Sequence, residues 1–298
     1  MKHIGFIGLG NMGMPMVENL LNDGFEVSGF DIDETSLKKF VSLGGKPVSF
    51  PNLLTLQCDV LFTSLPSEKV VEKIYFGEGG ILNKHTGTVL IDTSTVSPDL
   101  NHKLKNTADK FNVKYLASPV SGGVIGSKNR TLTFMVGGPK EVFDEVSPIL
   151  ERLGKNIFHV GERIDSGTTV KLINNLLIGF YTAGVAEALH IANKQNIDLD
   201  SLFDMLNVSY GQSRIYDRNY NNYIAKSDYE AGFTLNLLLK DLNFAIDLAN
   251  KHQLALPISE ELLELYGKAV DDGYGNKDMA ALYERVKDQS SIKSEGLL

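Results

Sequence analysis

Two patterns of apolar and polar residues divide the chain. Up to about residue 160, short runs rich in β-branched and aromatic residues alternate with segments in which apolar residues recur at helical spacing. The runs are HIGFIG, FEVSGFD, VLFTSLP, TVLIDTS, VKYLASPV, LTFMVGG and NIFHVG. Such alternation is typical of βαβ units, in which helices cover the faces of a mostly parallel sheet.

Beyond residue 166 no comparable strand pattern occurs, and apolar residues keep to helical spacing. Glycine and proline residues separate the segments. The predicted helices cover about 168–194, 199–207, 213–225, 234–252, 257–272 and 278–288. We therefore expect an α/β domain over residues 1–163, followed by an all-α domain over residues 164–298.

A glycine-rich turn, Gly8-Leu9-Gly10-Asn11-Met12-Gly13, follows the first predicted strand and precedes a predicted helix. In such a turn the first glycine allows a tight bend, the second lets a pyrophosphate approach the backbone, and the third lets helix and strand pack closely. The helix N-terminus then faces the phosphates. This context predicts a Rossmann dinucleotide-binding domain.

Asp31 ends the second predicted strand, at the position where such domains hold the ribose of the cofactor. A carboxylate there accepts both ribose hydroxyls of NAD and repels the additional phosphate of NADP, so NAD is expected and NADP is less favoured. Leu65, Pro66 and Thr95 follow later strands and could line the same crevice. A plainer interpretation is that the glycines only form a turn and that Asp31 caps the next helix.

Composition excludes several other classes of partner. The net charge is -8, and the sequence contains no dense cluster of basic residues. Binding to nucleic acid or to an anionic membrane surface requires such a cluster, so neither is an expected partner. Cys58 is the one cysteine, and a strand-like run begins at His3, so we expect a cytoplasmic protein without a signal sequence. The six histidines show no ligand spacing, so no metal site is expected.

Four segments, in order and at fitting distances, resemble the signature segments of the β-hydroxyacid dehydrogenases. This family includes 3-hydroxyisobutyrate dehydrogenase and tartronate semialdehyde reductase. The segments are GFIGLGNMGMPMVENLLNDG, SPVSGGVIGSKNRTLTFMVGG, GTTVKLINN and KDLNFAIDLA. The resemblance covers residues 3 to about 288, and it implies NAD(P)-dependent oxidation of a short hydroxy acid by a Rossmann domain followed by an all-α domain.

The resemblance also implies roles for individual residues. Lys171 corresponds to the catalytic lysine and Asn175 to an asparagine that helps to hold the substrate. Lys240 would lie near the cofactor. The segment Ser121-Gly122-Gly123 would bind substrate, although without the resemblance it would be interpreted as a generic turn. One departure is Ala117-Ser118, where the family often has Asp-Ala, and this difference affects the positioning of that loop.

The chemistry explains why polar residues would begin an apolar helix. Hydride removal from an alcohol requires a group that takes the hydroxyl proton, and a lysine can serve if its surroundings lower its pKa. Lys171, Asn174 and Asn175 lie on one helical face, which would line an active site between the domains. The alternative is a solvated first turn with an exposed lysine. Phe233 is a further candidate, to pack on the nicotinamide.

Several functions remain open at this point. TLTFMVGG and LNVSYGQS favour an enzyme similar to 3-hydroxyisobutyrate dehydrogenase. Alternatives are a tartronate, succinic or glyoxylic semialdehyde reductase, an imine or sugar-acid reductase, and a non-catalytic nucleotide-binding protein. The helix from about residue 168 is apolar almost all round, so a second subunit is expected to cover part of it in a homodimer or homotetramer.

Overall fold

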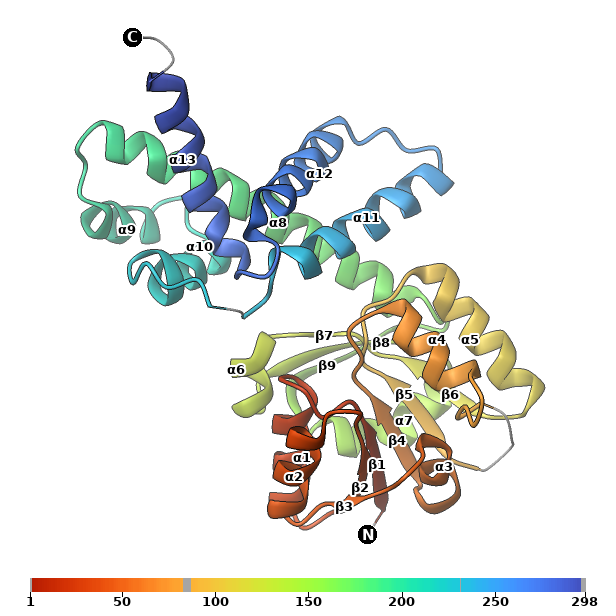
Figure 1. The fold of residues 1–298 in the computed structure, drawn as a ribbon. Coiled ribbons are helices and arrows are strands. Elements are labelled where there is room, and N and C mark those ends of the chain that lie inside the picture. The colour runs from red at the N-terminus through yellow and green to blue at the C-terminus, as the bar shows by residue number, and fades with distance from the viewer. Residues whose placement is uncertain (1, 83–86, 231, 296–298) are drawn as a thin grey trace. The chain divides into compact units, whose positions relative to one another are not determined.

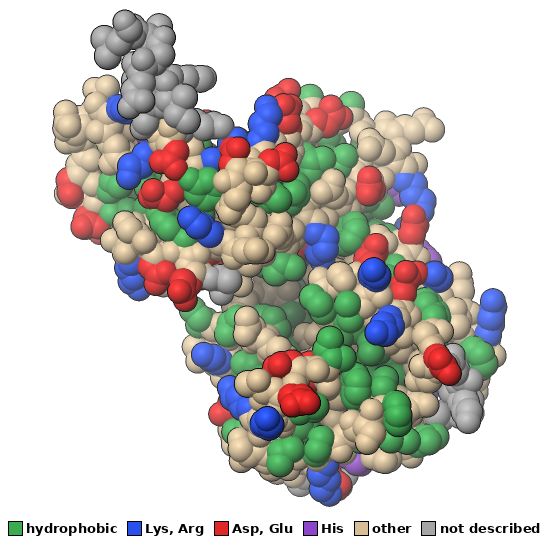
Figure 2. Space-filling model, in the orientation of Figure 1, with side chains coloured by type: hydrophobic (Ala, Val, Ile, Leu, Met, Phe, Trp, Pro, Cys, Tyr) green, Lys and Arg blue, Asp and Glu red, His purple; other side chains and the backbone are tan. Residues whose placement is uncertain are grey.

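A computed structural model of the chain describes residues 2–82, 87–230 and 232–295, with side chains up to residue 288 (Figure 1). The chain divides into two units, residues 1–171 and residues 172–298. Acidic and basic side chains are interspersed on the face of each unit that Figure 2 shows.

The first unit is built on a sheet in which nine strands are described. They are β1 (His3–Ile7), β2 (Glu26–Phe30), β3 (Lys46–Pro47), β4 (Val60–Thr63), β5 (Val89–Asp92), β6 (Lys114–Ala117), β7 (Val120–Ser121), β8 (Leu132–Gly137) and β9 (Gly154–Gly161). Their order is β3-β2-β1-β4-β5-β6-β8-β7, and β9 pairs with β8. The pairs from β3 to β6 are parallel, whereas β8 runs antiparallel to β6 and β7.

The run VKYLASPV forms two strands and not one continuous strand. Pro119 separates β6 from β7 and has no N–H for a strand ladder, but its carbonyl oxygen accepts a hydrogen bond of 3.1 Å from Met135 N. β6 pairs with both β5 and β8, whereas after Pro119 the pairing with β8 alone continues. β7 pairs with β8 through Val120 and Ser121 and ends next to Gly122.

Helices cover the sheet of the first unit (Figure 1). They are α1 (Gly13–Asn22), α2 (Glu34–Ser42), η1 (Pro51–Leu53), α3 (Leu54–Gln57), α4 (Glu68–Phe76), α5 (Pro98–Lys110), α6 (Gly123–Lys128) and α7 (Lys140–Leu150). Buried residues form two apolar cores, one that includes α1 and α7 and one that includes α4 and α5. β1 lies between β2 and β4, so the strand order reverses beside β1, and this is where an open α/β sheet binds its ligand.

The second unit is helical. Its elements are the greater part of α8 (Ser166–Lys194), α9 (Leu199–Asn207), α10 (Arg214–Asn219), the π-helical turn η2 (Tyr220–Ile224), α11 (Leu235–Lys251), α12 (Pro257–Ala269), the π-helical turn η3 (Val270–Tyr274), η4 (Met279–Ala281) and α13 (Leu282–Glu295). In the described part of this unit the strand-like pairing is one isolated bridge, between Thr234 and Asp278. The predicted fold class, an α/β domain followed by an all-α domain, is confirmed.

Helix α8 begins in the first unit and continues into the second. Among the described helices it is the one that is long and apolar enough to cross a membrane, with a mean hydropathy of 1.3, and 39% of that window is buried inside the chain. Long apolar helices of soluble proteins meet the same criterion. Other apolar residues of α8 are partly buried against the core of the second unit, and a further set is exposed.

Candidate active site

The three glycines of the first turn occupy three different environments. Gly8 has a φ of +94°, and a Cβ there would lie 2.2 Å from the carbonyl oxygen of Ser64, which follows β4. A Cβ on Gly13 would lie 1.9 Å from the carbonyl oxygen of Gly8. At Gly10 a Cβ would meet nothing within 4 Å. Gly8 therefore lets the turn pack against the end of β4, Gly13 lets the turn close on itself, and Gly10 leaves open space beside the backbone.

The open space lies at the start of α1. Gly10 and Asn11 are exposed and Met12 is half-buried. Met12 is the N-cap residue of α1 and makes no side-chain cap hydrogen bond, and the first turn of the helix carries no acidic residue. The uncapped N–H groups and the positive end of the helix dipole suit a pyrophosphate. The turn therefore fits a dinucleotide.

Asp31 is held beside this turn by two backbone donors. Leu9 N donates to Oδ2 at 2.6 Å and Asp33 N donates to Oδ1 at 2.9 Å. The residue that caps α2 is Asp33, whose carboxylate accepts from Ser36 N, so the interpretation of Asp31 as the helix cap is wrong. An ionised carboxylate has about four acceptor positions, so Asp31 retains capacity for ribose hydroxyls.

The sequence reasoning missed Ile32. Its side chain is 87% exposed directly after Asp31, where an apolar surface can pack on a nucleotide base. Because single exposed isoleucines are common on protein surfaces, exposure alone does not distinguish Ile32. Its position directly after Asp31 is the feature of the sequence that could have identified it.

Leu65, Pro66 and Thr95 lie at the carboxyl ends of β4 and β5. Leu65 N donates a hydrogen bond of 2.9 Å to the hydroxyl of Ser94, which joins the two strand ends. Leu65 and Thr95 are half-buried and Pro66 is exposed. The structure therefore brings these residues to the same edge of the sheet as Gly8.

Ser121, Gly122 and Gly123 join β7 to α6. Ser121 is half-buried and both glycines are exposed. Gly122 has a φ of +128° and Gly123 a φ of +60°, values that a residue with a side chain adopts only with strain. The segment thus exposes a hydroxyl and a stretch of backbone without side chains. Ala117, the departure from the family pattern, is buried and pairs with Asp92.

Lys171 lies near the start of α8 and is 8% exposed, so the alternative of an exposed lysine in a solvated turn is wrong. Its position is set by Gly167, one helical turn earlier. A Cβ on Gly167 would lie 1.9 Å from the carbonyl oxygen of Met135, so the first turns of α8 pack directly on β8. The sheet therefore fixes the helix that carries Lys171.

Asn175, one turn after Lys171, is completely buried in the second unit. Its Nδ2 donates to Oδ2 of Asp241 on α11 at 2.5 Å, and its Oδ1 accepts from Asn174 Nδ2 at 3.0 Å. Lys240 Nζ lies 3.1 Å from Asp241 Oδ1. Asn175, Lys240 and Asp241 therefore form one polar cluster.

Asp241 is a second residue of the site that the sequence motifs do not single out. Asp241 is 2% exposed. Asp241 follows Leu235 and Leu238 at intervals of three residues on the same helix, and both leucines are buried. This spacing could have predicted from the sequence that Asp241 lies on the buried face. A carboxylate on an apolar helix face needs partners, and Asn175 and Lys240 supply them.

Phe233 is half-buried next to the start of α11. Its backbone N donates a hydrogen bond of 2.9 Å to Asp278, which is completely buried and also accepts two hydrogen bonds from Arg218. Gly232 leaves room for this pair, because a Cβ there would lie 2.8 Å from Asp278 Oδ2. A buried ion pair therefore fixes the backbone of Phe233.

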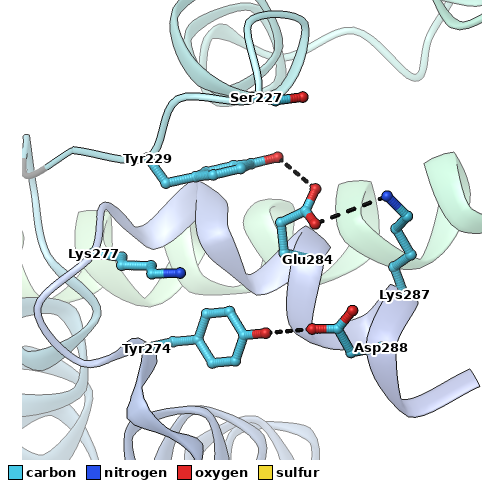
Figure 3. A pocket seen from close by; sticks show the side chains of 7 residues that line it. All are labelled: Ser227, Tyr229, Tyr274, Lys277, Glu284, Lys287 and Asp288. Atoms are coloured by element: carbon cyan, nitrogen blue, oxygen red, sulfur yellow. Dashed lines mark hydrogen bonds and ion pairs between the residues drawn. The ribbon is translucent and has the colours of Figure 1, made fainter. Parts of the chain in front are cut away.

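A surface pocket of about 350 Å³ lies elsewhere in the second unit (Figure 3). Its two carboxylates accept hydrogen bonds from tyrosines of the pocket: Tyr229 donates to Glu284 at 3.1 Å, and Tyr274 donates to Asp288 at 2.6 Å. The bond to Asp288, followed by burial, raises the pKa of Tyr274 to about 12. None of the predicted site residues lines this pocket. It is lined by Ser227, Tyr229, Tyr274, Lys277, Glu284, Lys287 and Asp288.

Among the described residues, no group of three or more His, Cys, Asp or Glu side chains is arranged to hold a metal ion. Each unit holds its own group of candidate residues. The first unit holds the turn that fits a dinucleotide and the buried Lys171, and the second unit holds the cluster of Asn175, Lys240 and Asp241.

Comparison with known proteins matches both units. Residues 3–161 match the NAD-binding domain of 6-phosphogluconate dehydrogenase, and residues 165–286 match the NAD-binding domain of NADP-dependent 3-hydroxyisobutyrate dehydrogenase. The chain is 34% identical to 2-(hydroxymethyl)glutarate dehydrogenase of Eubacterium barkeri, over 98% of this chain and 97% of that protein. It is 36% identical to 3-hydroxyisobutyrate dehydrogenase of Pseudomonas aeruginosa, over 90% of this chain and 93% of that protein.

A solved structure agrees with these matches. That of 3-hydroxyisobutyrate dehydrogenase from Mycobacterium tuberculosis with L-serine superposes with a TM-score of 0.85 at 29% identity, covering 96% of this chain and 99% of that chain. The similarity extends over both units. The chain belongs to the β-hydroxyacid dehydrogenase family of oxidoreductases, which use a nicotinamide dinucleotide.

Proposed function

We propose that the protein catalyses reversible hydride transfer between NAD and a short-chain β-hydroxy acid similar to 3-hydroxyisobutyrate, with Lys171 as the general acid/base. The observation that carries this proposal is the burial of Lys171 on a helix whose first turns pack against β8. Ionised lysines are rarely buried without a specific role or partner.

Bound NAD supplies the hydride acceptor. Lys171 takes the hydroxyl proton on Nζ as the hydride leaves, and it returns the proton when the reaction runs in reverse. Because Lys171 is largely removed from bulk water, the proton passes directly between Nζ and the substrate oxygen during hydride transfer. In the oxidative direction Lys171 then releases this proton to solvent, which completes the reaction. Gly167 contributes by letting the helix approach the sheet, which holds Nζ in one place.

Asn175 orients the substrate, and Asp241 sets the orientation of Asn175. An ionised carboxylate only accepts hydrogen bonds, so Nδ2 of Asn175 must face Asp241. One N–H and one lone pair of the amide then remain for substrate. The Ser121 hydroxyl and the backbone of Gly122 and Gly123 bind the substrate carboxylate.

Three acidic residues support NAD over NADP. Asp31 is fixed by Leu9 N and Asp33 N, and Asp33 and Glu34 are exposed directly after it. A phosphate on the ribose would add negative charge beside these carboxylates, whereas two hydroxyls can donate hydrogen bonds to Asp31. We place Phe233 and Lys240 beside the nicotinamide end of the cofactor.

The names of the relatives suggest the substrate class. 2-(Hydroxymethyl)glutarate, 3-hydroxyisobutyrate and L-serine share one fragment, a hydroxymethyl group on the carbon that bears the carboxylate, and they differ in the remaining substituent. Oxidation of this fragment gives a semialdehyde. The reverse reaction is the reduction of a semialdehyde, and it would use the same residues. A semialdehyde reductase is therefore the second candidate function.

We further propose that the protein is a homodimer or homotetramer in the cytoplasm. Apolar side chains spaced along one face of α8 are exposed in the single chain. A second copy of the chain would cover this stripe, and light scattering should give at least twice the monomer mass at micromolar concentration. A monomeric mass would contradict the proposal. The stripe consists of Val170, Ile173, Leu177, Tyr181 and Ile191.

The test of the function is a substrate panel. Formation of NADH from NAD, or of NADPH from NADP, is measured with 3-hydroxyisobutyrate, 2-(hydroxymethyl)glutarate, L-serine, D-glycerate or 4-hydroxybutyrate. We expect turnover with NAD and a substrate that carries the shared fragment. Absence of turnover in both directions, in protein that still binds NADH, would instead support a non-catalytic nucleotide-binding protein.

A further inference from the structure

Arg130 joins the end of α6 to β8 and makes an unusual set of contacts. Its backbone has a φ of +57°, in the left-handed region that side chains rarely adopt. Its guanidinium donates to both oxygens of Asp23, at 2.8 Å each, and Asp23 is the C-cap residue of α1. It also donates to Asn19 Oδ1 at 3.2 Å and to Asn19 O at 3.1 Å. Four hydrogen bonds therefore attach Arg130 to the C-terminal half of α1.

A second set of bonds attaches α6 to the nucleotide turn itself. The hydroxyl of Ser127 donates to the carbonyl oxygen of Met12 at 2.9 Å, and Met12 belongs to the turn that fits the pyrophosphate. Asn19 Nδ2 donates to the carbonyl oxygen of Ser127 at 2.9 Å. Ser127 and Asn19 are buried. The C-terminal end of α6 is thus bound to α1, through Met12 at the start of α1 and through Asn19 near its end. The two helices can be followed in Figure 1.

The segment Ser121-Gly122-Gly123 precedes these anchors and leads from β7 into α6. Ser121 is held by its pairing with Thr133 of β8, but the two exposed glycines leave the backbone after it with few local restraints. The position of this segment relative to the nucleotide turn therefore depends on the attachment of α6 to α1. Arg130 contributes charge-assisted hydrogen bonds to this attachment, through its guanidinium and the carboxylate of Asp23.

We propose that Arg130 is a positioning residue that couples occupancy of the nucleotide turn to the geometry of the Ser121–Gly123 segment. When the cofactor orders the turn at Met12, α1 and α6 move as one body, and the substrate-binding segment is presented in one arrangement. The proposal rests on the proposed function, since it assumes that Ser121, Gly122 and Gly123 hold the hydroxy acid. Nothing in this role requires Arg130 to touch either ligand.

The test compares Arg130→Gly, Arg130→Lys and Asp23→Asn with the wild type. Glycine suits the left-handed backbone, so Arg130→Gly removes the side chain without backbone strain and should remain folded. Lysine keeps the charge but lacks the planar guanidinium whose three nitrogens bind Asp23 and Asn19 at the same time, so it should rescue only in part. Lys114→Ala is the matched control, because Lys114 forms an exposed ion pair with Glu145 in the same unit.

The first readout is binding. The affinity for NADH is measured with and without 3-hydroxyisobutyrate, which forms a non-productive complex with the reduced cofactor. We expect Arg130→Gly and Asp23→Asn to bind NADH alone with an affinity within about threefold of the wild type. The factor by which 3-hydroxyisobutyrate raises the affinity for NADH should fall about fivefold or more in these variants, which is within the usual range of coupling between sites. The KM for hydroxy acid should rise by a similar factor while kcat changes less.

The second readout does not depend on turnover. Hydrogen exchange of the amides in residues 121–128 should slow when NADH binds to the wild type and to Lys114→Ala, and it should not slow in Arg130→Gly. Equal slowing in Arg130→Gly would overturn the proposal, as would unchanged coupling in all three variants. If the wild type oxidises no hydroxy acid but the exchange difference is present, the coupling stands and the proposed function fails.

Discussion

Replacement of Gly167 by alanine tests whether the sheet sets the position of Lys171. The added Cβ would lie 1.9 Å from the carbonyl oxygen of Met135, and real Cβ contacts are not shorter than 3.0 Å. The start of α8 or the strand β8 must therefore move by about 1.1 Å, because packed backbone has no room to absorb the contact. A misplacement of about 1 Å at a reacting group can reduce the rate by about 100-fold.

The effect on stability should be smaller than the effect on rate. Overpacking of a well-packed site costs about 1–3 kcal/mol, and alanine recovers about 1 kcal/mol through its helix propensity. We therefore expect Gly167→Ala to fold, to bind NADH within about threefold of the wild type, and to lose about 100-fold in kcat/KM. Circular dichroism, NADH titration and steady-state kinetics measure the three quantities.

Gly267→Ala is the matched control, since Gly267 also lies within a helix and its Cβ would meet nothing within 4 Å. This variant should keep wild-type activity and gain as much as about 1 kcal/mol of stability. Wild-type activity and stability in Gly167→Ala would refute the reasoning, because α8 would then not rest on β8 as described.

Three further substitutions test other parts of the account. Asp31→Ser should reduce the preference for NAD over NADP by about tenfold or more, measured as the ratio of the two kcat/KM values, and an unchanged ratio would show that Asp31 does not read the ribose. Asp241→Asn replaces the carboxylate that accepts a hydrogen bond from Asn175. Hydrogen bonds to a charged group contribute about 1.5–3 kcal/mol, so kcat should fall about tenfold or more. A decrease in kcat below twofold would show that Asp241 does not contribute to the site. Asp278→Ala leaves Arg218 without its buried partner and should cost about 3 kcal/mol in a denaturant titration, while a cost below about 1 kcal/mol would contradict the role of the pair in fixing Phe233.

Local sequence patterns were sufficient for the fold class. The alternation of strand and helix patterns predicted the α/β unit, and helical spacing after residue 166 predicted the helical unit, because these periods directly reflect which face of each element is buried. The glycine turn was equally accessible, since Gly8 and Gly13 are constrained by the turn itself. The split between β6 and β7 was less accessible, although Pro119 marks it.

Contacts between distant segments could not be predicted in this way. Asp241 accepts from Asn175, which is 66 positions away, and Arg130 binds Asp23, which is 107 positions away. A left-handed arginine has no signature in a single sequence, because the same residue is compatible with an ordinary loop. Lys171 illustrates the same limit: its helix start favoured an exposed lysine, and its burial depends on how α8 packs.

The role of Lys171 as general acid/base is tested by comparing Lys171→Met with the wild type in NAD-dependent oxidation of the best substrate from the panel. Methionine is close to lysine in length but cannot accept a proton. We predict a fall in kcat of at least about 100-fold, the usual contribution of a general acid/base, with NADH affinity within about threefold of the wild type. Turnover within about fivefold of the wild type, in a variant that binds NADH normally, would show that another group moves the proton.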